Sequence, residues 1–314
     1  MQQLVLIAIG GNSLIKDAEH MTVYDQYKAT GETSEHIAGI VGEGYRVVIT
    51  HGNGPQVGFI LLRSELARQV LHELPLDTCG ADTQGAIGYQ IAQTLDNALR
   101  RRGIDRTVVA VVTQTVVDED DPGFREPSKP IGPFYSRESA EQHRQSESWV
   151  MREDAGRGWR RVVPSPRPLE IVEVPAIRAL LEQEMIVVAA GGGGIPVVRL
   201  AESGDLAGVA AVIDKDLASC LLAKNLRADL FMMSTAVDKV ALDFGKPTQR
   251  DLDRMTVAEA RRYLTEGHFA PGSMKPKIEA SIDFLEHGGK RVIITQPHLL
   301  EEAIHGRTGT HIVP

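Results

Sequence analysis

The chain has 314 residues, 42% of them hydrophobic and 24% charged, which suits a globular protein with one large or two moderate domains. Its formal net charge of −8 argues against a nucleic-acid-binding surface, so an anionic ligand must be held by local donors. Cys79 and Cys220 form no CxxC pair, so neither a zinc site nor a disulfide framework is predicted. Because the sequence has no membrane-spanning apolar stretch and no signal peptide, we expect a cytoplasmic protein without membrane contact.

The first part of the chain alternates between short apolar runs and helical patterns. Apolar runs rich in β-branched residues predict buried strands, and Pro55 suits the first turn of a helix. The predicted strands cover residues 4–9, 46–50 and 107–113, and the predicted helices cover residues 24–43, 55–70 and 80–102. This alternation predicts a mostly parallel sheet with helices on both faces.

The alternation stops between residues 118 and 168. The segment is too long for an ordinary loop, and insertions of this length are usually lids or binding elements. Its acidic run at 118–121 is more typical of a solvated turn than of a metal site. Several arginines around Trp159 raise nucleic-acid contact as an alternative, but the acidic total and the prolines favour a small structured subdomain. Those arginines are Arg157, Arg160, Arg161 and Arg167.

The alternating pattern resumes after the insertion. Thr256, followed three residues later by Glu259, predicts a helix start with a capping box. The predicted strands cover residues 185–190, 228–234, 291–295 and 309–313, with part of a hairpin over 237–244 and helices over 256–264 and 272–286. We therefore expect an N-terminal half (1–117), an inserted subdomain (118–168) and a C-terminal half (169–314), without a sequence repeat between the halves.

Three of the apolar runs end in glycine-rich turns. These turns are Gly10-Gly11-Asn12, Gly52-Asn53-Gly54 and Gly191-Gly192-Gly193-Gly194. Glycine between a strand and a helix lets backbone N–H groups approach an anion, and ligands bind at the carboxyl ends of parallel strands. None of the turns has the spacing of a P-loop or of a dinucleotide fingerprint. Tight turns need glycine in any case, so it is the recurrence on separate strands that indicates phosphate binding.

Three lysines are candidates for contact with a phosphoryl group. Lys129, Lys215 and Lys277 each lie beside proline or glycine or at a strand-to-helix junction, although any one of them could be an ordinary surface lysine. A lysine suits a phosphoryl oxygen because it is a mobile point charge with three donors. Asp216 follows Lys215 directly, so it is the natural partner to orient the ammonium groups.

Beyond these features, the chain resembles the carbamate kinases, which have the amino acid kinase fold. The resemblance spans essentially the whole chain, and the segments at 129–134 and 153–159 are specific to carbamate kinases within that fold. The matching segments are residues 8–12, 50–58, 83–89, 129–134, 153–166, 191–197, 211–216 and 268–274. It implies a three-layer α/β sandwich with a mostly parallel central sheet and a small protruding lid at 118–168.

The resemblance also implies the reaction and the roles of individual residues. ATP and carbamate would give ADP and carbamoyl phosphate reversibly, in a homodimer. Lys129, Lys215, Asp216 and Lys277 would be catalytic. The carbamate or carbamoyl phosphate site would be formed by Gly10, Gly11, Asn12, Gly52, Asn53 and Gly54. The nucleotide would be bound by Gly192, Gly193, Asp214, Lys215, Thr235, Val237, Asp238, Met274, Pro276 and Lys277.

This chemistry agrees with the residues themselves. Carbamate is already an anion, so it needs no general base, and catalysis would come from alignment and from charge neutralisation. His51 is better interpreted as structural. We expect Mg²⁺ to be held mainly by the nucleotide phosphates, without a dedicated protein metal site. Two alternatives stay open: a kinase of the same fold for another small acid, such as acetylglutamate or a phosphonate, and a non-catalytic nucleotide sensor.

Overall fold

The computed structural model of the chain describes residues 2–10, 14, 19–147, 149–154, 158–270 and 272–314. The helices are α1 (Val23–Gly42), α2 (Gly54–Ala67), α3 (Leu76–Arg101), α4 (Pro122–Arg125), α5 (Arg137–Glu147), α6 (Val174–Glu182), α7 (Lys215–Leu226), α8 (Val257–Thr265), α9 (Met274–Glu286) and α10 (Leu300–Ile304). Two short 3₁₀ turns are η2 (Gly191–Gly193) and η3 (Pro297–Leu299). No helix within these ranges is long and apolar enough to cross a membrane.

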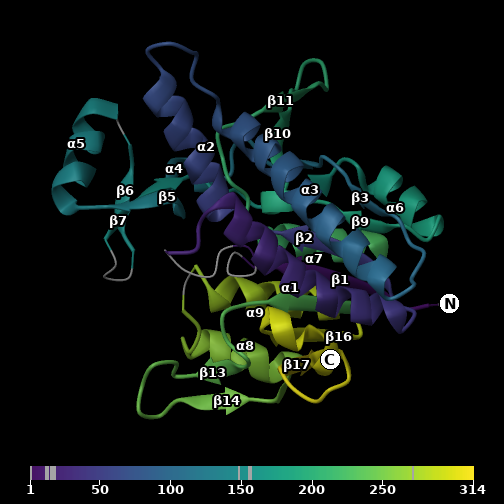
Figure 1. Cartoon of the computed structure of the whole chain (residues 1–314). Coiled ribbons are helices and arrows are strands. Elements are labelled where there is room, and N and C mark those ends of the chain that lie inside the picture. The colour runs from purple at the N-terminus through teal and green to yellow at the C-terminus, as the bar shows by residue number, and fades with distance from the viewer. Residues whose placement is uncertain (1, 11–13, 15–18, 148, 155–157, 271) are drawn as a thin grey trace.

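An eight-stranded sheet forms the centre of the molecule (Figure 1). Its order is β15 (Arg254–Thr256), β17 (Thr310–Val313), β16 (Arg291–Thr295), β12 (Leu230–Ser234), β1 (Leu4–Ile9), β2 (Arg46–His51), β9 (Ile186–Val188) and β3 (Val108–Ala110). Neighbouring strands run parallel except for the antiparallel pair β16 and β17. The prediction of a mostly parallel α/β sheet is confirmed.

Helices cover both faces of this sheet, which makes three layers. Strand β1 illustrates why its run of apolar residues is continuous. Leu6 and Ala8 pack among side chains of α6, α7, α8 and α9, whereas Val5 and Ile7 pack among those of α1, α3 and α10. Side chains alternate between the two faces of a strand, so a strand covered on both faces must be apolar at every position.

The third predicted strand is shorter than the sequence indicates. We predicted a strand over residues 107–113, but β3 ends at Ala110. Beyond it the chain leaves the central sheet, and the side-chain amide of Gln84 bonds both the backbone N–H and the carbonyl of Thr113. The chain then joins a second sheet of four strands, in the order β11 (Leu206–Gly208), β10 (Ile195–Arg199), β4 (Gln114–Val116) and β8 (Glu170–Ile171). A two-stranded hairpin, β13 (Val240–Leu242) with β14 (Arg250–Leu252), confirms the hairpin predicted near 237–244.

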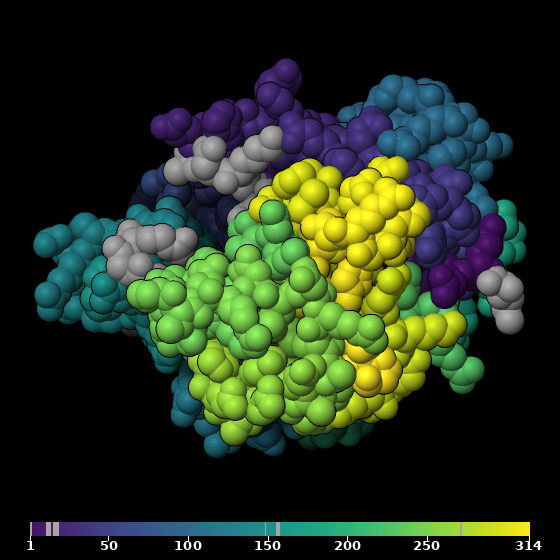
Figure 2. Space-filling view, turned by 90° about the horizontal axis from the view of Figure 1, so that it is seen from below, coloured from purple at the N-terminus to yellow at the C-terminus, as the bar shows by residue number. Residues whose placement is uncertain are grey.

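The inserted segment forms a separate arm that projects from the main body (Figures 1 and 2). Its antiparallel sheet has the order β5 (Lys129–Tyr135), β7 (Trp159–Val163) and β6 (Met151–Glu153), and α5 packs against it. Of the arginines considered for nucleic-acid contact, Arg160 and Arg161 lie in β7, and Arg167 follows it and donates its backbone N–H to Asp121. The Arg161 guanidinium lies 4.4 Å from the centre of the Trp149 ring, and Arg160 lies 5.3 Å from that of Phe134. Arg157 lies outside the described residues.

A close backbone contact and two ion pairs join the described part of the arm to α2. A Cβ atom added to Gly58 would lie 2.1 Å from the Cα atom of Gly132 in β5. Arg161 pairs with Glu65 at 3.1 Å, and Arg68 pairs with Glu147 at 2.8 Å. The arm therefore rests on the helix that begins directly after the turn at Asn53.

Replacing Gly58 with alanine is expected to lower the free energy of unfolding by about 1–3 kcal/mol, the usual cost of overpacking. The added methyl group must push β5 away from α2, although alanine normally stabilises a helix relative to glycine. Thermal unfolding measures the loss of stability. A shift in tryptophan emission reports the displacement of β5 from α2, because both tryptophans, Trp149 and Trp159, lie in the arm. The matched control is Gly85→Ala in α3, where an added Cβ meets nothing within 4 Å; equal stability of the two variants would contradict the steric argument.

Candidate functional site

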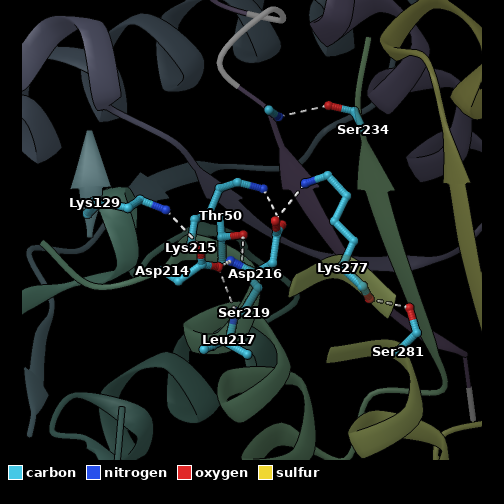
Figure 3. Close-up of polar contacts among 11 residues, drawn as sticks. Thr50, Lys129, Asp214, Lys215, Asp216, Leu217, Ser219, Ser234, Lys277 and Ser281 are labelled. Carbon is cyan, nitrogen blue, oxygen red and sulfur yellow. Dashed lines mark hydrogen bonds and ion pairs between the residues drawn. The ribbon is translucent and has the colours of Figure 1, made fainter. Parts of the chain in front are cut away.

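Three parallel strands of the central sheet end close together. Gly10 follows β1, Gly52 follows β2, and Ser234 ends β12. The backbone N–H of Gly10 donates to the Ser234 hydroxyl at 2.9 Å (Figure 3), and a Cβ on Gly10 would lie 2.7 Å from the Ser234 carbonyl oxygen. Glycine is therefore required at position 10 because the two strand ends approach so closely. This edge is where ligands bind in parallel α/β sheets.

A cleft with a volume of about 440 Å³ opens at this edge. It unites most of the predicted site residues, which come from both halves of the chain and from the inserted arm. Those lining it are Gly10, Gly52, Asn53, Gly54, Lys129, Gly192, Asp214, Lys215, Asp216, Thr235 and Lys277. Gly193, Val237, Asp238, Met274 and Pro276 do not line it, and Gly11 and Asn12 lie outside the described residues.

The cleft also contains residues that sequence reasoning missed. Arg160 lines it and donates from Nε to the carbonyl of Gly132 at 3.2 Å, so this arm residue supplies one more positive charge. Ser234 was missed as well, although a polar residue that ends an apolar strand was a signal for it. A separate cleft of about 480 Å³ near Arg254 and His311 contains none of the predicted site residues.

The start of α7 places two carboxylates and a lysine at the cleft. Asp214 is the N-cap residue, and its Oδ1 atom accepts from the backbone N–H groups of Asp216 and Leu217 at 2.9 and 3.4 Å. An aspartate is among the best N-cap residues because it satisfies N–H groups that lack helical partners. The cap fixes the backbone of the residues that follow it, which are Lys215 and Asp216.

Asp216 joins two lysines from different helices (Figure 3). Lys215 Nζ donates to Oδ1 and Lys277 Nζ to Oδ2, both at 2.6 Å. All three side chains are largely enclosed, with exposed fractions of 8% for Asp216, 12% for Lys215 and 11% for Lys277. Burial by itself raises the pKa of Asp216, but the two ammonium groups outweigh it and hold that pKa below its usual range. Burial lowers the pKa of Lys215 although Asp216 opposes this. The group is thus a carboxylate that orients two cations.

The third lysine reaches the cleft from the arm. Lys129, the first residue of β5, donates from Nζ to Oδ2 of Asp214 at 2.7 Å. Its side chain is 29% exposed and that of Asp214 is 15% exposed. The three ammonium groups of the cleft therefore pair with two carboxylates, those of Asp214 and Asp216.

The four-glycine turn has a packing role that the sequence did not reveal. An added Cβ on Gly191 would lie 2.3 Å from Nε2 of His51, and one on Gly192 would lie 2.2 Å from Nδ2 of Asn53. Gly192, Gly193 and Gly194 all have positive φ angles, which favour glycine. Gly191 and Gly192 therefore pack against the end of β2, whereas Gly193 and Gly194 pack against Ile213 and Thr115. Of these four glycines only Gly192 lines the cleft.

His51 is fully enclosed in the protein core. Burial lowers its pKa to about 4, against a smaller opposing effect of the Gly52 carbonyl, which lies 3.0 Å from Nδ1. The imidazole is therefore neutral at pH 7. This agrees with the interpretation of His51 as a structural residue.

The carboxylates of Asp214 and Asp216 pair with lysines and are not arranged around a metal site. Among the described residues, no group of three or more histidine, cysteine, aspartate or glutamate side chains could hold a metal ion. Such a cleft fits a cation that arrives with a phosphate ligand, because Mg²⁺ keeps several waters and needs few protein ligands. Ammonium groups and backbone N–H groups suit an anion with several oxygens.

Comparisons with known proteins find a kinase family and several carbamate kinases. The profile described as the amino acid kinase family matches residues 3–296. The chain is 52% identical over 316 residues to the carbamate kinase-like protein YahI of Escherichia coli strain K12. This alignment covers 100% of this chain and 99% of that protein. It is 49% identical to the carbamate kinase of Thermococcus kodakarensis, with 98% of each chain covered. A solved structure of the carbamate kinase from Giardia lamblia bound to AMP-PNP superposes with a TM-score of 0.91 at 43% identity, covering 99% of this chain and 98% of that one.

Proposed function

The chain belongs to the amino acid kinase family, and from this premise we propose that it is a carbamate kinase, which transfers a phosphoryl group reversibly between ATP and carbamate. The observation that carries the proposal is the buried carboxylate of Asp216, which holds Lys215 and Lys277 at the carboxyl edge of a parallel sheet. High identity to carbamate kinases over the whole chain supports the choice of carbamate as the acceptor.

The proposed reaction needs no proton transfer by the protein. In the direction of ATP synthesis, the bond between phosphorus and the carbamate oxygen breaks, and an oxygen of the ADP β-phosphate bonds to phosphorus. Carbamate leaves with the electron pair as an anion. Catalysis therefore depends on alignment and on neutralising the charge of the transferred group. Lys215 and Lys277 supply that charge. His51 has no role as a base, because it is buried and does not line the cleft.

We assign the two substrates to different parts of the cleft. The turn at Gly52-Asn53-Gly54 would hold carbamate or carbamoyl phosphate through the backbone N–H groups at the start of α2. Gly10 would lie beside the substrate, with its own N–H donated to Ser234. Gly192 and Thr235, which line the same cleft, would lie toward the nucleotide. The nucleotide would also be bound by residues that do not line the described cleft, which are Gly193, Val237, Asp238, Met274 and Pro276. Mg²⁺ would be held mainly by the nucleotide phosphates and would add positive charge there.

The setting of the enzyme is part of the proposal and rests on the resemblance alone. We propose that the protein acts in the cytoplasm as a homodimer and makes ATP during arginine or agmatine breakdown. Light scattering of the purified protein would test the dimer. Growth on arginine of a strain that lacks the protein would test the pathway.

Lys129→Ala is expected to lower kcat/KM for carbamoyl phosphate by about 10²-fold while leaving ADP binding nearly unchanged. The reason is that Lys129 reaches the cleft from the arm, which contains none of the residues assigned to the nucleotide. A lysine that the arm holds at the cleft adds positive charge there, and the arm would exclude water from a substrate that water would decompose. Steady-state kinetics and calorimetry of ADP binding measure the two effects. A parallel loss of ADP affinity would place Lys129 in the nucleotide site instead.

A coupled assay for ATP formed from carbamoyl phosphate and ADP tests the proposed function directly. We expect turnover with this pair and none when acetyl phosphate replaces carbamoyl phosphate. In the direction that consumes ATP, acetylglutamate and phosphonates are tested in place of carbamate as acceptors of the phosphoryl group. Turnover with one of these instead of carbamate would identify another kinase of the fold. Tight binding of ADP without any turnover would identify a nucleotide sensor.

A further inference from the structure

The two carboxylate oxygens of Asp214 have different partners. Oδ1 caps α7 through the backbone N–H groups of Asp216 and Leu217, and Oδ2 accepts from Lys129 at 2.7 Å. Asp214 and Lys129 are 85 residues apart in sequence, so this contact joins the arm to the start of α7. Figure 3 shows Lys129 pointing toward Asp214, on the opposite side of Lys215 from Lys277.

We propose that Asp214 is a positioning residue for Lys129, in the way that Asp216 is for Lys215 and Lys277. The segment Asp214-Lys215-Asp216 then orients the three lysines of the cleft from a single helix start. This inference rests on the proposed function, in which the three lysines face the transferred phosphoryl group.

The chemistry of the carboxylate favours this role over direct contact with the nucleotide. An ionised carboxylate only accepts hydrogen bonds and repels phosphate oxygens. The described contacts of Asp214 already engage both of its oxygens with donors. Lys129 is therefore held over the cleft before the substrate arrives, and the phosphoryl group meets an ammonium that has lost much of its freedom. Preorganised donors of this kind cost no reorganisation during the reaction.

The variant Asp214→Asn tests the role without removing the helix cap, because asparagine is as good an N-cap residue as aspartate. It is expected to lower kcat/KM for carbamoyl phosphate by about tenfold, as for a lost charged hydrogen bond. In a Lys129→Ala background the same substitution should have no further effect, because Lys129, its partner in the described part of the arm, is gone. Asp121→Asn is the matched control, since Asp121 caps α4 through Gly123 but contacts no lysine of the cleft.

A second readout in the ligand-free protein is independent of activity. Trp149 lies with Leu61, Leu62 and Glu65 of α2 around a small crevice where the arm meets that helix. If the ion pair holds the arm, Asp214→Asn and Lys129→Ala should increase acrylamide quenching of tryptophan emission equally. The double variant should show no additional increase.

The outcomes separate this proposal from the proposed function. Non-additive quenching in a protein that makes no ATP from carbamoyl phosphate would support the positioning role and reject the carbamate kinase. Additive effects of the two substitutions on both quenching and kcat/KM would overturn the positioning role. A loss of ADP affinity in Asp214→Asn equal to its loss of kcat/KM would also overturn it and would assign Asp214 to the nucleotide.

Discussion

Replacing Lys277 or Lys215 with alanine is expected to lower kcat by about 10²–10³-fold, with a much smaller change in KM. Each ammonium is buried and held at 2.6 Å by Asp216, so its position is fixed before the reaction. Charge on the phosphoryl group is redistributed in the transition state, so a fixed cation contributes more there than in the substrate complex. Steady-state kinetics in the ATP-forming direction measures both constants.

Lys224→Ala is the matched control for this prediction. Lys224 of α7 pairs with Asp283 of α9 at 2.7 Å, so it joins the same two helices outside the cleft. Its loss is expected to change kcat by less than about threefold, because partly exposed ion pairs contribute little. Near-normal turnover of Lys215→Ala or of Lys277→Ala would remove the replaced lysine from the proposed chemistry. Equal losses of kcat in these two variants and in Lys224→Ala would remove both lysines from it.

Asp216→Asn is expected to cost about 3 kcal/mol of unfolding free energy, as well as most of the activity, because it leaves two buried ammonium groups without their counter-ion. The pKa of Asp216 in the folded protein lies below its ordinary value of 3.8. Its stabilising contribution is therefore fully present above about pH 4 and is lost only as pH falls through the lowered pKa. Urea unfolding at pH 7 and at acid pH, on wild type and variant, measures this difference.

Asp283→Asn provides the comparison for Asp216. Asp283 also accepts from a lysine, Lys224, but its side chain is 42% exposed against 8% for Asp216. Water can replace the lost partner there, so we expect a destabilisation below about 1 kcal/mol. If Asp216→Asn were as stable as Asp283→Asn and still inactive, Asp216 would act on the substrate rather than as the counter-ion of the lysines.

Local patterns in the sequence determined the type of most elements. Strand β1 reads as buried because every residue from Leu4 to Ile9 is apolar, and α8 begins at the predicted capping box of Thr256 and Glu259. These features depend on interactions between residues a few positions apart, so their energetics are contained in the local sequence. The neighbourhood of Asp216 and Lys215 was predictable for the same reason, because the two residues are adjacent.

The tertiary structure alone decided which distant residues meet. Asp216 and Lys277 are 61 residues apart, and Lys129 and Asp214 are 85 apart. The insertion of β9 between β2 and β3 brings the four-glycine turn against His51 and Asn53. Contacts of this range depend on how whole layers pack, which no short pattern encodes. A glycine selected for close packing and one selected to admit a phosphate look alike in the sequence, and only the neighbouring atoms distinguish them.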